Sequence, residues 1–256
     1  MSNIQTAKNL VGTFVSGDVE VARQSALPTY IQHNLDFGNG LEAFIEAVEG
    51  LQQAPVKTTL ETVREFEDGD YVILQNKINF AGSGDATSFD VFRFEGDKIA
   101  EHWDNVTPVV APNPSGHTQL DGATEVSDLD KTEENKTLVE NFVKDVLMGA
   151  HPEKIEEYLA GEDYIQHNTG IADGVSGVSA AFAKMAEDGV AMEYQEIHKV
   201  LGQGNFVLVM GEGKFAGQHV GFYDLFRVTN SKIVEHWDII QEIPAESEWK
   251  NQNGKF

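Results

Sequence analysis

Residues 30–34 of this chain read Tyr-Ile-Gln-His-Asn, and the same five residues return at 164–168. A second stretch, Lys-Ile-x-Glu-His-Trp-Asp, stands at 98–104 and again at 232–238. Both stretches recur after the same interval of 134 residues. Two separated motifs that keep one spacing indicate an internal duplication, so we expect two copies of one small domain in tandem.

The duplication predicts a first domain at residues 1–110 and a second at 132–256. The chain has 256 residues, 41% of them hydrophobic, which is enough for a packed core in each copy. Residues 111–131 are rich in proline and glycine and have neither a helical nor a strand period. We predict a linker or an ordered inter-domain segment there.

Within each copy, helical patterns come first and strand patterns follow. The predicted helices cover residues 4–15, 18–26 and 40–51 in the first copy and 134–148, 152–159 and 174–185 in the second. The predicted strands of the first copy are 58–66, 71–80, 88–94 and 98–106, which are rich in β-branched and aromatic residues. Helices followed by strands predict an α+β fold, with the helices on one face of an antiparallel sheet.

The composition excludes several classes of function. The chain has no cysteine, which rules out disulfides, thiolate metal sites and cysteine nucleophiles. Its formal charge of −24 would repel phosphate backbones and anionic lipids, so we expect neither nucleic acid nor membrane as a partner. The start of the chain lacks the features of a signal peptide and no run of 18 apolar residues occurs, which favours the cytoplasm.

The two repeated stretches, together with Asp-x-Phe-Arg at 90–93 and 224–227, resemble the SnoaL-like branch of the nuclear transport factor 2-like superfamily. That branch and its relatives include polyketide cyclases, ketosteroid isomerase and scytalone dehydratase. The resemblance implies a cone in each copy, in which a curved sheet wraps around helices and encloses an apolar pocket. It also implies that the copies pack on each other as a pseudo-dimer within one chain, or on a second chain. This fold hosts enzymes and binding modules alike, so it does not fix the activity.

The Glu-His-Trp-Asp stretch supplies the first catalytic candidates. Residues two apart on a strand project from the same face, which pairs His102 with Asp104 and His236 with Asp238. A histidine and a carboxylate in an apolar pocket can act as general base and as donor to an oxyanion. The alternative is a structural end strand whose histidine bonds to the backbone.

Asp90 and Asp224 are a second pair of catalytic candidates. The resemblance places them where ketosteroid isomerase has the acidic residue that donates to the oxyanion, a role that needs a protonated carboxyl in an apolar site. The alternative is an ion pair with Arg93 or Arg227.

The turn at residues 95–98 decides whether these candidates share a pocket. A simple hairpin would place Asp90 with Glu101 and Trp103, whereas a bulge would place it with His102 and Asp104. The resemblance favours the second arrangement, so we expect a bulge.

The Tyr-Ile-Gln-His-Asn stretch supplies the ligand-binding candidates. Strand alternation would turn Tyr30, Gln32 and Asn34 to one face and His33 to the other. The candidates are Tyr30, Gln32, His33 and Asn34 in the first copy and Tyr164, Gln166, His167 and Asn168 in the second. Asn34 and Asn168 stand where ketosteroid isomerase has its aspartate base, and an amide cannot abstract a proton.

The copies differ on the strands at 71–77 and 206–213, where Gln-Asn-Lys in the first is replaced by Met-Gly-Glu-Gly in the second. We expect a roomier pocket in the second copy.

These observations predict a cofactor-free general acid–base enzyme that acts on a small apolar carbonyl compound by isomerisation, dehydration or aldol closure. The alternative is a non-catalytic module that binds a hydrophobic molecule. No cofactor is expected, because the chain has no glycine-rich phosphate loop or dinucleotide fingerprint. No metal is expected either, because the spacing of His33, His102 and Asp104 matches no standard ligand motif.

Overall fold

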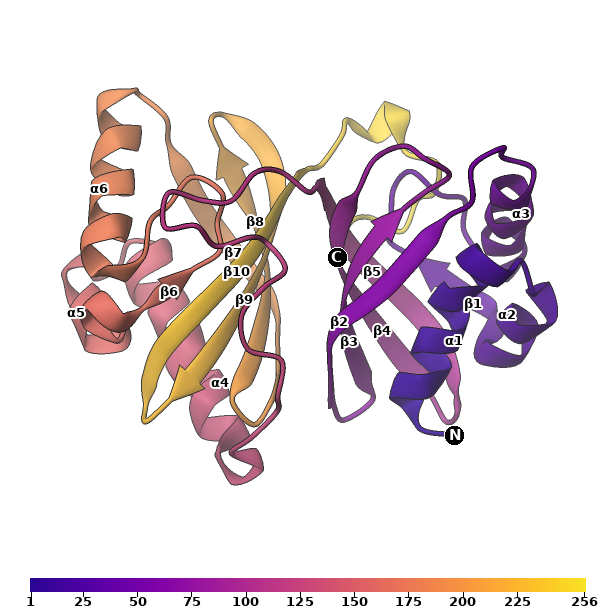
Figure 1. Ribbon diagram of the computed structural model, residues 1–256, viewed down its shortest axis with the longest axis horizontal. Helices are drawn as coiled ribbons and strands as arrows, with labels where there is room; N and C mark the ends of the chain where they lie inside the picture. The colour runs from indigo at the N-terminus through magenta and orange to yellow at the C-terminus, as the bar shows by residue number, and fades with distance from the viewer. The chain divides into compact units, whose positions relative to one another are not determined.

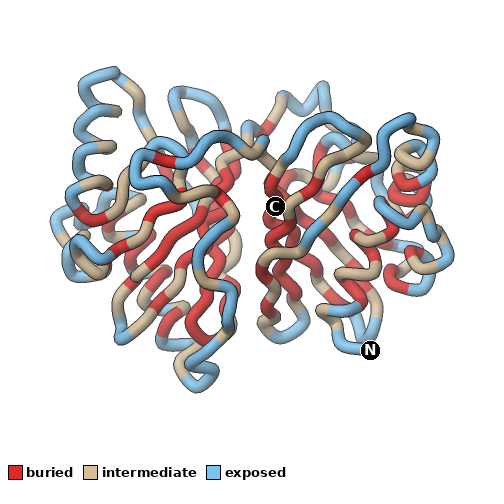
Figure 2. The backbone as a smooth tube through the Cα atoms, viewed as in Figure 1, coloured by how far each residue is buried: buried red, intermediate tan, exposed pale blue.

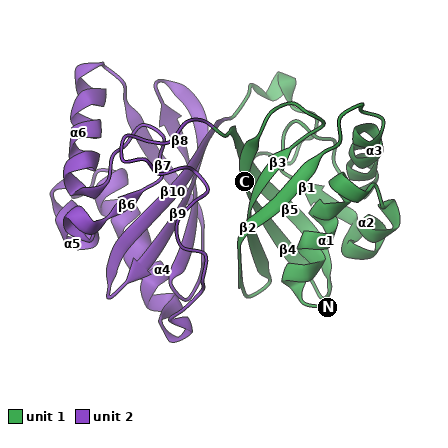
Figure 3. Cartoon of the chain, in the orientation of Figure 1, with its two compact units in different colours: residues 1–109, 243–256 green, residues 110–242 purple.

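A computed structural model describes residues 1–256, and the chain divides into two compact units (Figure 3). Unit 1 comprises residues 1–109 together with 243–256, and unit 2 comprises residues 110–242. These boundaries differ from the expected ones at both ends of the second copy. Residues 111–131 belong to unit 2, and the last fourteen residues belong to unit 1.

The side chains of two asparagines account for this assignment. The Asn113 amide donates to the carbonyls of Gln166 and Ile171 in unit 2. The Asn251 amide donates to the carbonyls of Asn34 and Phe37 in unit 1. Each segment therefore satisfies buried backbone groups of the unit that it packs on.

Unit 1 consists of three helices and five strands (Figure 1). The three helices and the last four strands follow the expected order, and an additional strand lies between the second and third helices. The helices are α1 (Asn3–Ser16), α2 (Val19–Ser25) and α3 (Leu41–Gln52). The strands are β1 (Ala26–Gln32), β2 (Thr59–Asp68), β3 (Tyr71–Asn79), β4 (Ala86–Glu95) and β5 (Lys98–Pro108).

Unit 2 has the same plan with a less regular helical part. Its helices are α4 (Thr132–Phe142), α5 (Ile155–Tyr158) and α6 (Gly174–Glu187), and its strands are β6 (Ile165–Gln166), β7 (Met192–Gln203), β8 (Phe206–Phe215), β9 (Gln218–Thr229) and β10 (Lys232–Glu242). The expected helix at 134–148 changes into a π-helical turn at Val143–Leu147. Short 3-10 turns cover Leu129–Lys131, Pro152–Lys154, Gly161–Asp163 and, in unit 1, Glu246–Glu248.

Each sheet has five strands in the same spatial order, β1-β5-β4-β3-β2 in unit 1 and β6-β10-β9-β8-β7 in unit 2. Four strands are antiparallel, but β1 and β6 pair in parallel with β5 and β10. The sheets are therefore mixed and not purely antiparallel. The parallel pairing places Gln32 beside His102 and Gln166 beside His236, which joins the two repeated motifs.

The helices of each unit cover one face of its sheet, and the core lies between them (Figures 1 and 2). In unit 1, Leu10 and Val48 from the helices pack with Phe92 from the sheet. In unit 2, the core contains Val139 from a helix and Phe226, which corresponds to Phe92, from the sheet. Each large side chain buried in this way stabilises the fold by about 1.5–3 kcal/mol.

The helix starts have local causes in the sequence. The Ser2 hydroxyl accepts from the backbone N–H of Gln5 at the start of α1, and the Asp18 carboxylate accepts from Glu20 and Val21 at the start of α2. Such caps satisfy N–H groups that have no partner within the helix. None of the helices combines the length and the apolar character that crossing a membrane requires.

Candidate functional site

Each unit encloses a cavity between its helices and its sheet, and the two cavities differ in size. The cavity of unit 1 has a volume of about 50 Å³, and that of unit 2 has about 310 Å³. The roomier second pocket expected from the sequence is confirmed. Unit 2 thus reaches the size of a small-ligand pocket, whereas unit 1 has room for a few water molecules.

The polar end of each cavity is built from the repeated motifs. The lining polar residues are Tyr30, Gln32, Asn34, Asp90, His102 and Asp104 in unit 1 and Tyr164, Gln166, Asn168, Asp224, His236 and Asp238 in unit 2. The structure therefore brings together all six catalytic candidates, three in each unit, with six of the eight ligand-binding candidates.

The rest of the unit 2 cavity is apolar. Phe142 and Phe182 line it from the helical side, and Met192 and Phe222 line it from the sheet. The lining includes one cation, Lys184, whose ammonium lies within 2.5 Å of both carboxylate oxygens of Asp188. The cavity is therefore suited to an apolar molecule with its polar group at the motif end.

A bulge after the β4–β5 turn sets the register that places the aspartates in the cavities. Phe94 lies opposite Ile99, but the register then shifts, so that Asp90 lies opposite Asp104. A shift between Ile233 and Glu235 in β10 has the same effect in unit 2, where Asp224 lies opposite Asp238. The expected bulge is confirmed.

The hydrogen bonds around His236 determine which ring nitrogen carries a proton. The Gln166 amide nitrogen donates to the Tyr164 hydroxyl at 3.2 Å, so its oxygen faces the His236 Nδ1 at 2.9 Å. That oxygen also accepts from the backbone N–H of Asn168. Because an amide oxygen only accepts, Nδ1 must donate. The other ring nitrogen, Nε2, lies 3.0 Å from Asp224 Oδ1 and shares a proton with it.

The same arrangement holds in unit 1. The His102 Nδ1 lies 2.9 Å from the Gln32 oxygen, and its Nε2 lies 3.0 Å from Asp90 Oδ1. Each ring also stacks on a phenylalanine, Phe92 at 4.6 Å and Phe226 at 4.7 Å between ring centroids. The two histidines are therefore fixed in the same orientation.

The second carboxylate oxygen of the aspartate distinguishes the two units. In unit 1, the Asn76 amide and the Ser88 hydroxyl donate to Asp90 Oδ2 at 2.9 and 2.5 Å. In unit 2, Asp224 Oδ2 is buried without a hydrogen-bond partner. The strand registers explain the difference, because Gly211 and Phe222 have the places of the two donors.

Tyr194 occupies the space that Gly211 leaves. A Cβ at Gly211 would lie 2.2 Å from the Tyr194 hydroxyl, so only glycine allows this approach. The hydroxyl is buried and makes no hydrogen bond of standard length. Burial raises its pKa well above the usual value, and the charge of Asp224 together with a hydrogen-bonding contact to that carboxylate raises the pKa further. Tyr194 therefore stays protonated and is able to donate.

The third polar group is Asp238, which is held by Asn168. The Asn168 amide donates to Asp238 Oδ2 at 2.6 Å, and the Asn168 oxygen accepts from the N–H of Gly170. Burial raises the pKa of Asp238 even though His236 acts in the opposite direction. Asn168, which replaces the aspartate base of ketosteroid isomerase in the resemblance, is thus a positioning donor here.

His33 and His167 do not line the cavities. Strand alternation turns them to the other face of each sheet, where the rings stack on Trp103 at 4.9 Å and Trp237 at 4.7 Å. His33 Nε2 lies 2.8 Å from Glu101, and His167 Nε2 lies 2.9 Å from Glu235.

The two arginines of the Asp-x-Phe-Arg stretches lie on this same outer face. Arg93 Nε donates to Glu101 at 2.7 Å and Arg227 Nε donates to Glu235 at 2.6 Å. The ion pairs of Asp90 and Asp224 with these arginines, considered from the sequence, are therefore not formed. Each arginine stands three positions after its aspartate on the strand, so the two side chains point to opposite faces.

Sequence reasoning missed Tyr194. It lies on β7, where two register shifts, one directly after Tyr194, disrupt the alternation that would have placed it. The available signal was Gly211 on the neighbouring strand, since a glycine within a strand often marks a close approach.

Helices packed on one face of a strongly curved five-stranded sheet are the architecture that the resemblance implies, so the α+β cone fold is confirmed for each unit. No protein-family model matches the chain, and no curated protein matches it. Similar solved structures include TsrD from Streptomyces laurentii, which is 18% identical over 40% of this chain and 85% of that one, with a TM-score of 0.36.

Two further structures match over a similar length. An NTF2-like protein from Cytophaga hutchinsonii is 14% identical over 42% of this chain and 92% of that one, with a TM-score of 0.36. An LEH-like epoxide hydrolase from M. tuberculosis is 15% identical over 40% of this chain and 80% of that one, with a TM-score of 0.34. Each match thus covers a part of this chain about as long as one unit.

Proposed function

We propose that unit 2 is a cofactor-free general acid–base catalyst that removes a proton next to the carbonyl of a small apolar compound. The observation that supports this most directly is Asp224, whose Oδ2 is buried in the cavity without a hydrogen-bond partner. Its other oxygen shares a proton with His236. A carboxylate with one free oxygen in an apolar cavity is a suitable general base.

In the proposed step, the C–H bond next to the carbonyl breaks and its proton moves to Asp224 Oδ2. The electron pair of that bond forms the carbon–carbon double bond of an enolate, and the negative charge develops on the carbonyl oxygen. The Tyr194 hydroxyl and the carboxyl of Asp238 are the donors for this oxyanion. Return of the proton from Asp224 to another carbon completes an isomerisation. Alternatively, the enolate carbon attacks a second carbonyl, the π bond of that carbonyl breaks, and the proton from Asp224 passes to the resulting alkoxide, which completes an aldol closure.

Unit 1 is proposed to have a structural role. Its cavity is too small for such a compound, and Asp90 Oδ2 is occupied by Asn76 and Ser88. The chain thus offers a matched comparison between two aspartates in the same place of the same fold.

The test is exchange of α-protons for deuterium, followed by NMR on a panel of small cyclic ketones and diketones. This measures proton abstraction whatever the later steps are. Asp224→Asn is expected to slow exchange by about 100-fold or more, the usual contribution of a positioned base. Asp90→Asn is expected to leave the exchange rate close to that of the unmodified protein.

Equal loss in both variants would contradict the proposal. Saturable binding of the same ketones, without exchange in the unmodified protein, would instead favour the alternative function of a module that binds an apolar molecule. Tyr194, Gln166 and Asn168 would then position the ligand.

A further inference from the structure

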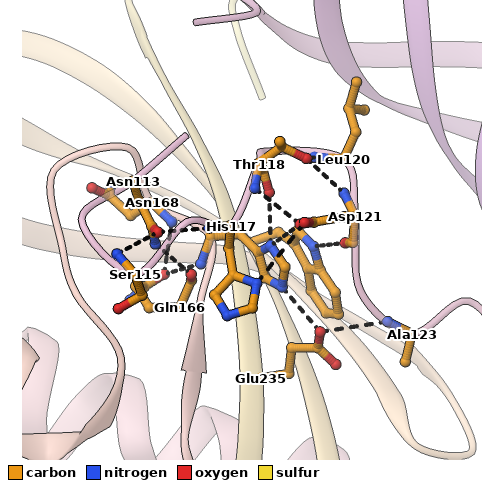
Figure 4. Close-up of polar contacts among 12 residues, drawn as sticks. Asn113, Ser115, His117, Thr118, Leu120, Asp121, Ala123, Gln166, Asn168 and Glu235 are labelled. Carbon is orange, nitrogen blue, oxygen red and sulfur yellow. Dashed lines mark hydrogen bonds and ion pairs between the residues drawn. The ribbon is translucent and has the colours of Figure 1, made fainter. Parts of the chain in front are cut away.

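A short segment of unit 2, residues 113–123, folds over the outer face of β6 and β10, and we refer to it as the strap (Figure 4). Asn113 anchors its start, as described above. The Trp237 indole donates to the carbonyl of Asp121 at 2.9 Å near its end. The strap thereby brings His117 and Asp121 to the outer face, where His167 lies.

These three side chains form a compact group of possible ligands. His167 Nδ1 lies 2.8 Å from Asp121 Oδ1, and His117 Nδ1 lies 3.9 Å from Asp121 Oδ2. One ligand atom from each residue lies within 4.8 Å of the other two. Zinc bound at about 2.0–2.2 Å from nitrogen and oxygen ligands requires such a cluster.

The far side of each imidazole is held by a second carboxylate. His167 Nε2 lies 2.9 Å from Glu235, and His117 Nε2 lies 3.1 Å from Asp173. Both rings therefore present Nδ1 to Asp121 and Nε2 to an outer acid. Carboxylate–histidine–metal triads have this arrangement, because the outer acid fixes the Nε2–H tautomer and leaves the other nitrogen for the metal.

The outer acid Glu235 is held from two sides. His167 Nε2 lies 2.9 Å from Glu235 Oε1, and Arg227 Nε donates to Glu235 Oε2 at 2.6 Å. Asp121, Asp173 and Glu235 together place three negative charges around the cluster against the one charge of Arg227. The excess suits a divalent cation.

The Nδ1 nitrogen of His167 also faces more oxygen than it can satisfy. The carbonyl oxygen of Thr118 lies at 2.7 Å and Asp121 Oδ1 at 2.8 Å. One N–H cannot donate well to two oxygens. A cation at this place would instead be coordinated by the nitrogen and by both oxygens.

Close packing of the strap depends on Gly122. Its φ of +94° lies in the left-handed region, and a Cβ there would lie 2.2 Å from Glu235 Oε1 and 2.9 Å from His167 Nε2. The turn after Asp121 therefore brings the backbone directly onto the histidine–glutamate pair.

Unit 1 provides an internal comparison. Residues 251–255 read Asn-Gln-Asn-Gly-Lys, against Asn-Pro-Ser-Gly-His at 113–117. His33 is held in the same way, by Glu101 at Nε2 and by the carbonyl of Gly254 at Nδ1. However, Lys255 has the place of His117, and its ammonium donates to the carbonyl of Asp104. The second histidine is specific to unit 2.

We propose that His117, Asp121 and His167 form a binding site for a divalent transition-metal ion such as Zn²⁺, with both histidines coordinating through Nδ1. Glu235 and Asp173 orient the two rings. The site lies on the opposite face of the sheet from the unit 2 cavity, so it is independent of the proposed catalysis. Its role is to fix the strap on β6 and β10.

The test is isothermal titration of the metal-free full chain with Zn²⁺, together with the visible spectrum of the Co²⁺ form. We expect one strong site per chain and the absorption of low-symmetry Co²⁺ with nitrogen ligands. Asp121→Asn and His117→Gln are expected to weaken binding at least tenfold, and Asp173→Asn about tenfold through the outer acid. Far-UV circular dichroism of each metal-free variant checks that it folds.

A matched control comes from Glu212 on β8, which lies between His198 of β7 and His219 of β9 at 2.7 and 2.6 Å. Glu212→Gln is expected to leave the strong site unchanged. If the strong site is lost in Glu212→Gln but kept in Asp121→Asn, or if the unmodified chain binds no Zn²⁺, the proposal is wrong.

Discussion

Two aspartates in corresponding places, Asp90 and Asp224, show how neighbouring residues decide the role of a carboxyl. Asp90 accepts from Asn76, Ser88 and His102, which makes it a satisfied structural group. Asp224 keeps the histidine, and its Oδ2 accepts no hydrogen bond of standard length. A buried carboxylate oxygen without a partner lowers stability by roughly 1–3 kcal/mol, and such a loss is typical of functional sites.

Asp238 leads to a prediction about stability and pH. Its pKa is raised in the folded state, mainly by burial. A carboxyl with a raised pKa contributes stability below its ordinary value of 3.8, and this contribution is lost as the pH rises through the folded-state value. Asp238→Asn removes the ionisation and is therefore expected to stabilise the protein at pH 7 by about 0.5–1 kcal/mol.

Urea unfolding at several pH values measures this effect. The gain in stability of Asp238→Asn should be present at pH 7 and should vanish below the ordinary pKa of the carboxyl. The rate of proton abstraction should fall in the same variant. Destabilisation of the same size at both pH values would show that the Asn168 contact matters more than the buried charge.

At the scale of elements, the approach of β7 to β8 creates the difference between the units. Tyr194 reaches the cavity because Gly211 has no side chain. In unit 1, Leu60 and Ile78 are paired where unit 2 has Tyr194 and Gly213. The wall of the larger cavity thus depends on Tyr194 of β7 and Gly211 of β8 together, because a side chain at Gly211 would exclude the tyrosine ring.

Gly211→Ala is expected to destabilise the protein by about 1–3 kcal/mol, because its Cβ overlaps the Tyr194 ring. Tyr194→Leu should remove the overlap, so that the double variant is more stable than the sum of the single changes predicts. Urea unfolding of the two single variants and the double variant gives this coupling. Additive effects would show that the ring moves aside without cost.

At the scale of the molecule, each unit contains the segment that follows the last strand of the other unit. Residues 110–131 follow β5 and pack in unit 2, and residues 243–256 follow β10 and pack in unit 1. Asn113 and Asn251 anchor these segments with equivalent amide hydrogen bonds. The stability of each unit therefore depends on chain that lies far away in sequence.

Asn251→Ala tests this dependence. It leaves the carbonyls of Asn34 and Phe37 without their donor, and we expect a loss of about 1–3 kcal/mol. Hydrogen exchange read by mass spectrometry should increase in residues 26–109, whereas Asn113→Ala should increase exchange in residues 132–242. The opposite pattern would mean that the segments stabilise the units that precede them.

The sequence by itself determined the repeat, the α+β class and the face of each motif residue. These features are local, since side chains alternate with a period of two along a strand and with 3.6 along a helix. Tyr30, Gln32 and Asn34 therefore faced the cavity as expected, and His33 faced away.

Only the tertiary structure decided which groups meet. Asp224 meets His236 through a bulge that shifts the register, and it lacks donors because of residues on two other strands. His117 meets His167 because a segment outside the predicted domains packs on unit 2. Contacts between neighbouring strands and between packed segments depend on register and packing, and the period of a single strand contains no information about either.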